Sequence, residues 1–230
     1  MPNDSLYSVD AELFMHVRRA AGSDDSRYYL QGVFIEPIPE GGAWLVATDG
    51  FIMLVARDAT AHAPAPALVS LSLLEVQDEF CECGDHITAA QRDFTRGRLL
   101  FEDPGVDISA VTLRNEWAAY RETIGVVECP APPEKYPPWR RVWGDPSADG
   151  TKQVKIGPET DSYGFDPALL SRLAGARAFR LITETDSGPS VVLFHDKPEL
   201  VGLIVPKAMK SSPIGLATDL RRAAVALASA

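Results

Sequence analysis

The chain has 230 residues, of which 46% are hydrophobic and 23% are charged, and this is the composition of a soluble globular protein. Its formal charge of −10 argues against a uniformly basic nucleic-acid binder. No apolar run is long enough to span a membrane and no signal-like leader opens the chain, so we expect a cytoplasmic protein. Three cysteines are an odd count, which disfavours a disulfide framework.

The first part of the chain has the pattern of one strand, one helix and three further strands. A strand is expected at Leu6 to Val9, and Asp10 can cap a helix over Ala11 to Ala21. Glycine-containing turns then separate three segments that are rich in aromatic and β-branched residues. These predicted strands are Tyr28 to Ile35, Ala43 to Thr48 and Phe51 to Val55.

A second unit of similar pattern follows an Ala/Pro connector at 59–67, which we expect to be extended. A helix with acidic residues on its open face is predicted over Ser72 to Phe80. Strands are predicted at Leu68 to Leu71, Ile87 to Phe94, Arg98 to Glu102 and Val106 to Leu113. The segment Asn115 to Glu122 favours a helix, and the sequence predicts an insertion near 103–135.

A third unit follows a proline-rich segment at 130–146, which reads as a linker or a wall of extended chain. Asp166 and Pro167 are typical of a helix start, and this helix should reach about Leu173. Strands are expected at Ala178 to Thr183, Ser190 to Phe194 and Leu200 to Val205, with a further candidate at Thr151 to Ile156 and an Ala-rich helical tail at 213–230. The repeated unit predicts an α+β fold, with helices on one face of antiparallel sheets.

Three blocks of sequence add a more specific signal, because they resemble one family in the same order. The first block is RYYLQGV at 27–33 with VATDG at 46–50, the second is YPPWRRV at 136–142, and the third is GFD at 164–166 with VGLIVP at 201–206. They resemble the bacterial DNA polymerase III beta subunit, the sliding clamp. The resemblance covers residues 9–208 and implies the DNA-clamp fold, built from repeated β-α-β-β-β half-units.

The resemblance also shows departures from the family pattern. Family chains have three clamp-type domains of two half-units each and pair into a ring. Here we expect one such domain at 1–142, a partial second one at 143–210 and the tail at 211–230. Phe51 and Ile52 replace charged family residues after Thr-Asp-Gly, and Lys207-Ala208 stands where Met-Arg would be. The abbreviated form is similar to clamp-like proteins of phages or mobile elements.

The resemblance implies a hydrophobic pocket that receives short linear peptides from polymerases and other clamp users. An apolar hollow with a few polar groups at its rim suits a peptide anchor. The alternative is that these residues are ordinary core residues at strand ends. The implied lining is Leu30, Thr48, Gly50, Met53, Pro137, Arg141, Val142, Leu203, Val205 and Pro206.

The resemblance further implies loose, sequence-independent contacts between inward-facing helices and the phosphates of double-stranded DNA. A ring with a basic lining and an acidic exterior is compatible with the negative total charge. A solvated helix face is the alternative for each arginine, and the acidic middle helix counts against a uniformly basic lining. The candidates are Arg18, Arg19, Arg27, Arg172, Arg177 and Arg180.

Metal binding and catalysis have little support in the sequence. Cys81, Cys83 and His86 lie close together, but the Cys-x-Cys spacing lacks a second pair, and buried or free thiols are the favoured reading. No nucleophile elbow, phosphate loop or paired-carboxylate motif stands out. We therefore expect no enzyme activity, no metal and no cofactor.

The favoured function is a sliding-clamp-like processivity factor that tethers a DNA polymerase or another clamp-motif protein, with a clamp loader as a further partner. The alternative is a clamp-fold module that binds such peptides without encircling DNA, and a small α+β enzyme is a third class. An odd half-unit leaves open strand edges, which predicts a homo-oligomer. Two other ways to satisfy the open edge remain. Residues 103–135 or the C-terminal tail could fold over it, or residues 103–162 could contain a fourth half-unit.

Overall fold

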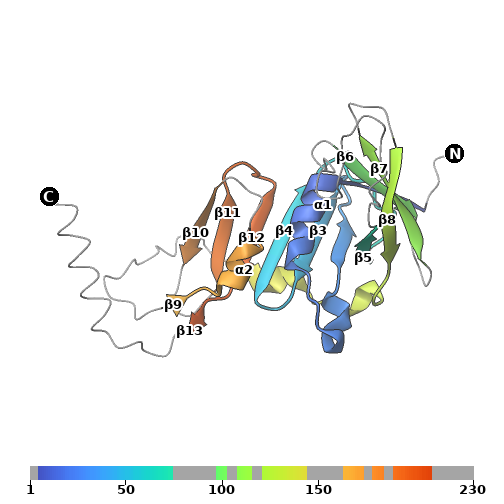
Figure 1. The fold of residues 1–230 in the computed structure, drawn as a ribbon. Helices are drawn as coiled ribbons and strands as arrows, with labels where there is room; N and C mark the ends of the chain where they lie inside the picture. Colours follow the sequence, from blue (N-terminus) through green and yellow to red (C-terminus); the bar gives the residue numbers. More distant parts are fainter. Residues whose placement is uncertain are drawn as a thin grey trace, which may run out of the picture.

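The computed structural model of the chain describes residues 5–74, 97–102, 108–115, 121–143, 163–173, 178–183 and 189–208. Within these residues one antiparallel sheet of eleven strands runs in the order β1-β6-β7-β8-β5-β2-β3-β4-β12-β11-β10 (Figure 1). The helices α1 and α2 pack on the same face of this sheet and share one hydrophobic core. The architecture is therefore α+β with helices on one face, as the repeated pattern predicted.

Three units follow one another along the chain, and each of their elements has the following bounds. The first unit contains β1 (Leu6–Asp10), α1 (Ala11–Val17), β2 (Val33–Pro37), β3 (Ala43–Thr48) and β4 (Ile52–Asp58). The second contains β5 (Ala67–Leu73), β6 (Gly97–Glu102), β7 (Ser109–Asn115) and β8 (Arg121–Glu128). The third contains β9 (Tyr163–Gly164), α2 (Pro167–Ser171), β10 (Phe179–Thr183), β11 (Ser190–Phe194), β12 (Leu200–Ile204) and β13 (Lys207–Ala208).

Both helices begin where the sequence predicted. The Asp10 carboxylate accepts a hydrogen bond from the Leu13 amide at 2.8 Å, and the Asp166 carboxylate accepts one from the Ala168 amide at 2.9 Å. These are N-caps, which satisfy a backbone donor that the first helical turn leaves without an intrahelical partner. α1 is shorter than predicted, because the chain continues after Val17 as a 3₁₀ turn, Arg18–Ala20.

Three predictions for local structure were wrong, the first of them in the first unit. The segment from Tyr28 was predicted as a strand, yet a 3₁₀ helix covers Asp25–Leu30 and β2 begins only at Val33. Asp24 accepts hydrogen bonds from the Ser26 amide at 2.9 Å and the Ser26 hydroxyl at 2.7 Å, and this cap overrides the β-propensity of the aromatic residues.

The second unit also differs from its prediction. Ser72 and Leu73 extend β5 instead of starting a helix, because they pair with β8. Asn115 and Arg121 lie in the β7–β8 pair rather than in a helix, so the second unit has a strand that the sequence did not predict. The remainder of the predicted helix to Phe80 lies outside the described residues, and so do the predicted strands at 87–94 and 151–156 and the tail at 213–230.

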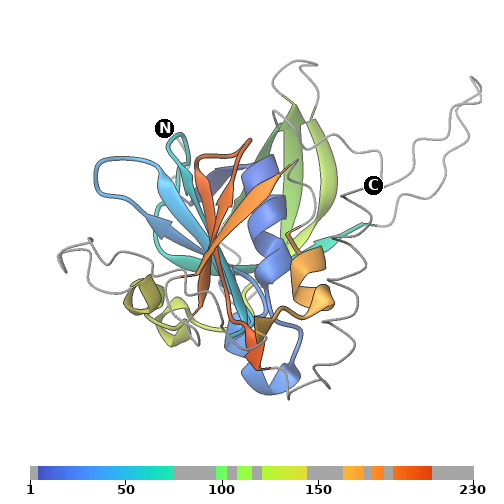
Figure 2. The ribbon, with the colours of Figure 1, turned by 90° about the vertical axis from the view of Figure 1, so that its left-hand side faces the viewer.

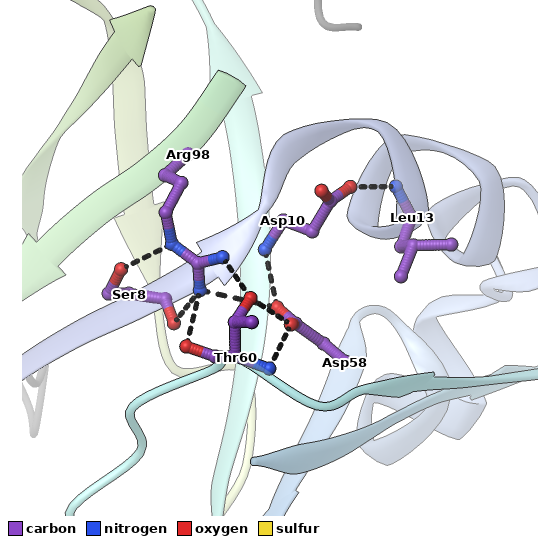
Figure 3. A network of polar contacts seen from close by, with 6 residues as sticks. All are labelled: Ser8, Asp10, Leu13, Asp58, Thr60 and Arg98. Carbon is purple, nitrogen blue, oxygen red and sulfur yellow. Dashed lines mark hydrogen bonds and ion pairs between the residues drawn. The ribbon is translucent and has the colours of Figure 1, made fainter. Parts of the chain in front are cut away.

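The first strand of the first unit is exchanged into the second unit. β1 pairs with β6 of the second unit, whereas β5 pairs both with β2 of the first unit and with β8 of its own. Arg98 of β6 fixes this exchange through a polar network around β1 (Figure 3), in which its guanidinium donates to the Ser8 hydroxyl and carbonyl, both at 2.8 Å, and to the Thr60 hydroxyl at 2.7 Å. Buried Asp58 closes the network, because it accepts from the Asp10 amide at 2.6 Å and forms an ion pair with Arg98 at 3.3 Å.

The central strands are buried on both faces. In β4 every residue except Arg57 is buried, which explains why its sequence is a continuous apolar run rather than an alternation. One face packs against α1 and α2, and the segment 130–143 covers the other with the short 3₁₀ helices Pro133–Lys135 and Trp139–Trp143. Figure 2 shows these short helices on the side of the strands opposite α1 and α2.

The third unit joins the first through β12 and β4. Leu200 pairs with Ala56 at one end of this ladder and Ile204 with Ile52 at the other. Backbone hydrogen bonds extend it on both sides, from the Arg57 amide to the Glu199 carbonyl at 3.0 Å and from the Val205 amide to the Phe51 carbonyl at 2.8 Å. The sheet therefore continues from one unit into the next without a break.

Candidate functional site

The three sequence blocks converge on the junction between β4 and β12. Met53 of β4 pairs with Thr48 of β3 on one side and with Leu203 of β12 on the other. Met53, Leu203 and Leu30 are buried and belong to one apolar cluster, which also contains Tyr136 from the proline-rich segment. Residues from three distant parts of the chain thus meet at one place on the sheet.

The Thr48-Asp49-Gly50 turn is built by its own side chains. The Thr48 hydroxyl donates to the Ile52 carbonyl at 2.7 Å and accepts from the Gly50 amide at 3.0 Å. The Asp49 carboxylate accepts from the amides of Phe51 at 2.7 Å and Ile52 at 2.9 Å. Gly50 has φ +94°, a conformation that residues with a side chain rarely adopt. The turn is therefore specified residue by residue, and it presents Phe51 to solvent.

Two exposed apolar side chains lie next to each other beside this cluster. Phe51 is 55% exposed and Val205 is 39% exposed, and their backbones are joined by the hydrogen bond from Val205 to Phe51. Adjacent exposed apolar side chains, unlike those scattered singly over a surface, mark a candidate contact site. The rest of the predicted lining divides by burial: Thr48 is buried, Pro137 and Pro206 are half-buried, and Gly50, Arg141 and Val142 are exposed.

The proline-rich segment is held on the sheet by aromatic side chains. Tyr136 stacks on Phe34 with 4.7 Å between ring centroids, and burial raises the pKa of the Tyr136 hydroxyl above its usual range. The Trp139 indole donates to the Glu36 carboxylate at 3.0 Å, and the Arg140 guanidinium donates to the same oxygen at 2.6 Å. Sequence reasoning missed Glu36, since a lone acid in a predicted strand carries no signal for a partner a hundred residues away.

Several of the arginines predicted to contact DNA have partners within the protein. Arg18 donates to the Leu71 carbonyl at 2.7 Å, and burial lowers the pKa of its guanidinium. Arg27 forms an ion pair with Asp24 at 3.3 Å and also donates to the Asp49 carbonyl at 3.0 Å. Arg172 forms an ion pair with the Asp49 carboxylate at 2.6 Å.

The remaining candidates are placed differently. Arg19, which follows α1, and Arg180, on β10, are exposed, and Arg177 lies outside the described residues. Cys81, Cys83 and His86 lie outside them too, and within the described part of the chain no group of three His, Cys, Asp or Glu side chains is placed to hold a metal. None of the helices described is both long and apolar enough to cross a bilayer.

Several solved bacterial structures share this arrangement of strands and helices. The sliding clamp (DNA polymerase III subunit beta) of Bartonella birtlesii, solved with griselimycin bound, superposes with a TM-score of 0.52 at 13% identity, over 91% of this chain and 68% of that one. The beta subunit of Thermotoga maritima gives 0.53 at 15% identity, over 89% and 66%. The C. crescentus beta sliding clamp gives 0.52 at 16% identity, over 90% and 66%.

The fold is that of the sliding clamps. Neither a protein-family model nor a curated protein sequence matches the chain, so the likeness rests on structure and shows the fold alone. The chain spans about two thirds of the length of these clamps. They are bacterial subunits, and the likeness supports a clamp-like fold rather than the phage or mobile-element form expected from the sequence.

Two contacts between units of the clamp fold were not predicted from the sequence. Arg172 joins Asp49 at one end of the β4–β12 ladder, and the Lys197 ammonium pairs with the Glu12 carboxylate near the other. Each pair links residues more than a hundred positions apart, so no local pattern marks them. Together they tie both ends of the junction beside which Phe51 and Val205 are exposed.

Proposed function

We propose that this chain is a non-enzymatic tethering protein of the clamp type, which holds a DNA polymerase or another clamp-motif protein through an apolar peptide site at the β4–β12 junction. The observation that carries the proposal is the pairing of Met53 with Leu203 beneath the exposed Phe51 and Val205. A peptide anchor needs a packed apolar floor and exposed apolar groups beside it, and the buried Met53–Leu203 pair next to exposed Phe51 and Val205 supports such a site here.

The site would favour an apolar peptide. Phe51 adds an exposed aromatic ring where the family pattern has a charged residue, and Arg141 is one of the exposed cations of the segment 130–143, together with Lys135 and Arg140. An apolar side chain of the peptide would cover Phe51 and Val205, and a carboxylate of the peptide would be attracted to Arg141. The expected partner is therefore a short linear segment with apolar anchors and at most a few acidic groups.

A second candidate function is favoured by the arginines. Three of the six proposed DNA contacts, Arg18, Arg27 and Arg172, bond to groups of the protein itself, with the Arg27 side chain still exposed, and the chain carries a formal charge of −10. Phosphate contacts need cations that are free to face the duplex. A clamp-fold module that binds clamp-motif peptides without encircling DNA would need no such phosphate-contacting cations.

Encircling DNA would require more than one chain. In the described residues β10 pairs on one side only, with β11, whereas the outer edge of β1 is bridged by His62. An open edge is a ready template for another strand. We propose a homo-oligomer that uses the β10 edge, with a clamp loader as a further partner if the assembly closes into a ring. The division of the chain into domains at 1–142 and 143–210 and a tail at 211–230 stays a prediction.

The peptide site is tested by fluorescence anisotropy with a labelled clamp-motif peptide. We expect a Kd on the order of 1 μM, which corresponds to about 8 kcal/mol. Val205→Asp should abolish binding, because it places a charge where an apolar side chain must dock, and should leave the fold intact because Val205 is exposed. Ile108→Asp, an exposed site just before β7 in the far half of the sheet, is the matched control. Equal binding by both variants would contradict the proposal.

A further inference from the structure

The turn between β11 and β12 docks on the first helix through a buried charge. Lys197 is only 8% exposed, and its ammonium pairs with the carboxylate of Glu12 in the first turn of α1. The Leu200 amide donates to the Lys197 carbonyl at 3.0 Å, which closes the turn that carries the lysine. A buried ammonium is costly unless a carboxylate compensates it, so the docking of this turn depends on Glu12.

His16 lies on the same face of α1, four residues after Glu12. Its Nε2 atom is buried and has no hydrogen-bond partner in the part of the chain that the structure describes. The charged groups that face it are Glu12 and Arg19 from its own helix and the following turn, and Lys197 and Asp196 from the β11–β12 turn. The neutral imidazole therefore sits beside a buried cation, at the contact between the first and third units.

We propose that Glu12, His16 and Lys197 form a proton-sensitive clasp, which holds the third unit on α1 when His16 is neutral and releases it when His16 becomes charged. A proton on His16 would place a second cation beside Lys197, whose ammonium already pairs with the carboxylate of Glu12. The buried Nε2 atom would also carry a proton with no acceptor among the described residues. Opening the clasp exposes His16 and Lys197 to water. This removes both the repulsion between the two cations and the cost of burying the protonated Nε2 atom.

The direction of the pH dependence follows from linkage. Burial, and then the charges of Lys197 and Arg19, lower the pKa of His16 below its ordinary value of 6.5 in the closed clasp. In the open form the imidazole is hydrated and regains the ordinary pKa. The open form therefore binds more protons, and opening is increasingly favoured as the pH falls from 6.5 toward the lower pKa of the closed form. Each pKa unit of difference changes the opening equilibrium about tenfold.

The experiment is hydrogen exchange of the full chain at about pH 7.5 and about pH 5, followed by mass spectrometry and corrected for intrinsic exchange. We expect the protection of the β12 amides to fall at the lower pH, while the β2 and β3 amides keep theirs. His16→Gln, which cannot be protonated, should abolish the loss. His195→Gln removes an exposed histidine two residues from Lys197 and should leave the loss unchanged.

Three results would overturn the clasp. One is equal protection of β12 at both pH values in the wild-type chain, and the second is the same loss in His16→Gln as in wild type. The third is a loss that includes β2 and β3 equally, which would mean global unfolding. Glu12→Gln is the complementary variant, because it leaves Lys197 uncompensated and should reduce β12 protection at both pH values. None of these readouts depends on peptide or DNA binding, so the clasp and the proposed function can fail separately.

Discussion

The Arg172 guanidinium lies 2.6 Å from the Asp49 carboxylate, and this ion pair ties the end of α2 to the β3–β4 turn. The same carboxylate caps the amides of Phe51 and Ile52 through its other oxygen. One side chain thus shapes the turn that presents Phe51 and also anchors the third unit beside it. The candidate peptide site and the junction between units therefore depend on a common residue.

Two substitutions separate these roles of Asp49. Asp49→Asn keeps an oxygen for the two amides and loses the charge opposite Arg172, so the free energy of unfolding should fall by about 1 kcal/mol. Asp49→Ala loses the turn hydrogen bonds as well and should cost about 3 kcal/mol. Urea unfolding followed by circular dichroism measures both. If the two variants lose the same amount, the carboxylate does not shape the turn independently of Arg172.

Asp10 provides a test in which charge and capping have opposite effects. Burial first, and the neighbouring Asp58 carboxylate in addition, raise the pKa of Asp10 above 3.8, so its ionised form is disfavoured in the folded protein. Asp10→Asn keeps the cap on Leu13 without the charge and should match or exceed wild-type stability at neutral pH. Asp10→Ala should lose about 1 kcal/mol with the cap.

The pH dependence of these variants checks the cause. Because the pKa of Asp10 is raised by folding, its unfavourable contribution is present above the raised pKa and disappears as the pH falls toward 3.8. Any advantage of Asp10→Asn over wild type should therefore shrink on acidification, whereas the deficit of Asp10→Ala relative to Asp10→Asn should persist. Thermal unfolding at several pH values measures this, and an advantage that grows with acid would refute the assignment.

DNA binding can be tested with the two exposed arginines of the proposed set. If Arg19 and Arg180 contact phosphates, the double variant with glutamine at both positions should bind duplex DNA more weakly, whatever its sequence. The slope of log K against log salt concentration should decrease by about 0.9 for each lost contact. Arg18→Gln is a useful comparison, because Arg18 donates to the Leu71 carbonyl and its loss should lower stability instead. An unchanged salt slope in the double variant would favour the peptide-binding module.

Assembly can be measured by light scattering at micromolar protein. Phe179→Lys places a charge on the β10 edge and should lower the mass of an oligomer that uses this edge. Leu193→Lys, at similar exposure on the neighbouring internal strand β11, should not. A strictly monomeric mass for the wild-type chain, unchanged by deletion of 211–230, would exclude the homo-oligomer.

Local features of this protein could be predicted from the sequence because each of them is satisfied within a few residues. Asp10 and Asp166 cap helices whose first amides lie two or three positions away. Thr48, Asp49 and Gly50 build their turn from their own side chains and backbone. The order of helix and following strands in the first and third units followed from such signals, and so did the α+β class.

Only the tertiary structure decided how the units combine. The pairing of β1 with β6, the extra strand β8 and the joining of β4 to β12 depend on ladders between distant segments, and any of several apolar strands could have satisfied the same pattern. The roles of Arg18 and Arg172 were decided in the same way, since an arginine in a sequence looks the same whether it faces phosphate or a carbonyl of its own chain. Long-range pairing is specified by complementary surfaces, and these exist only once the chain has folded.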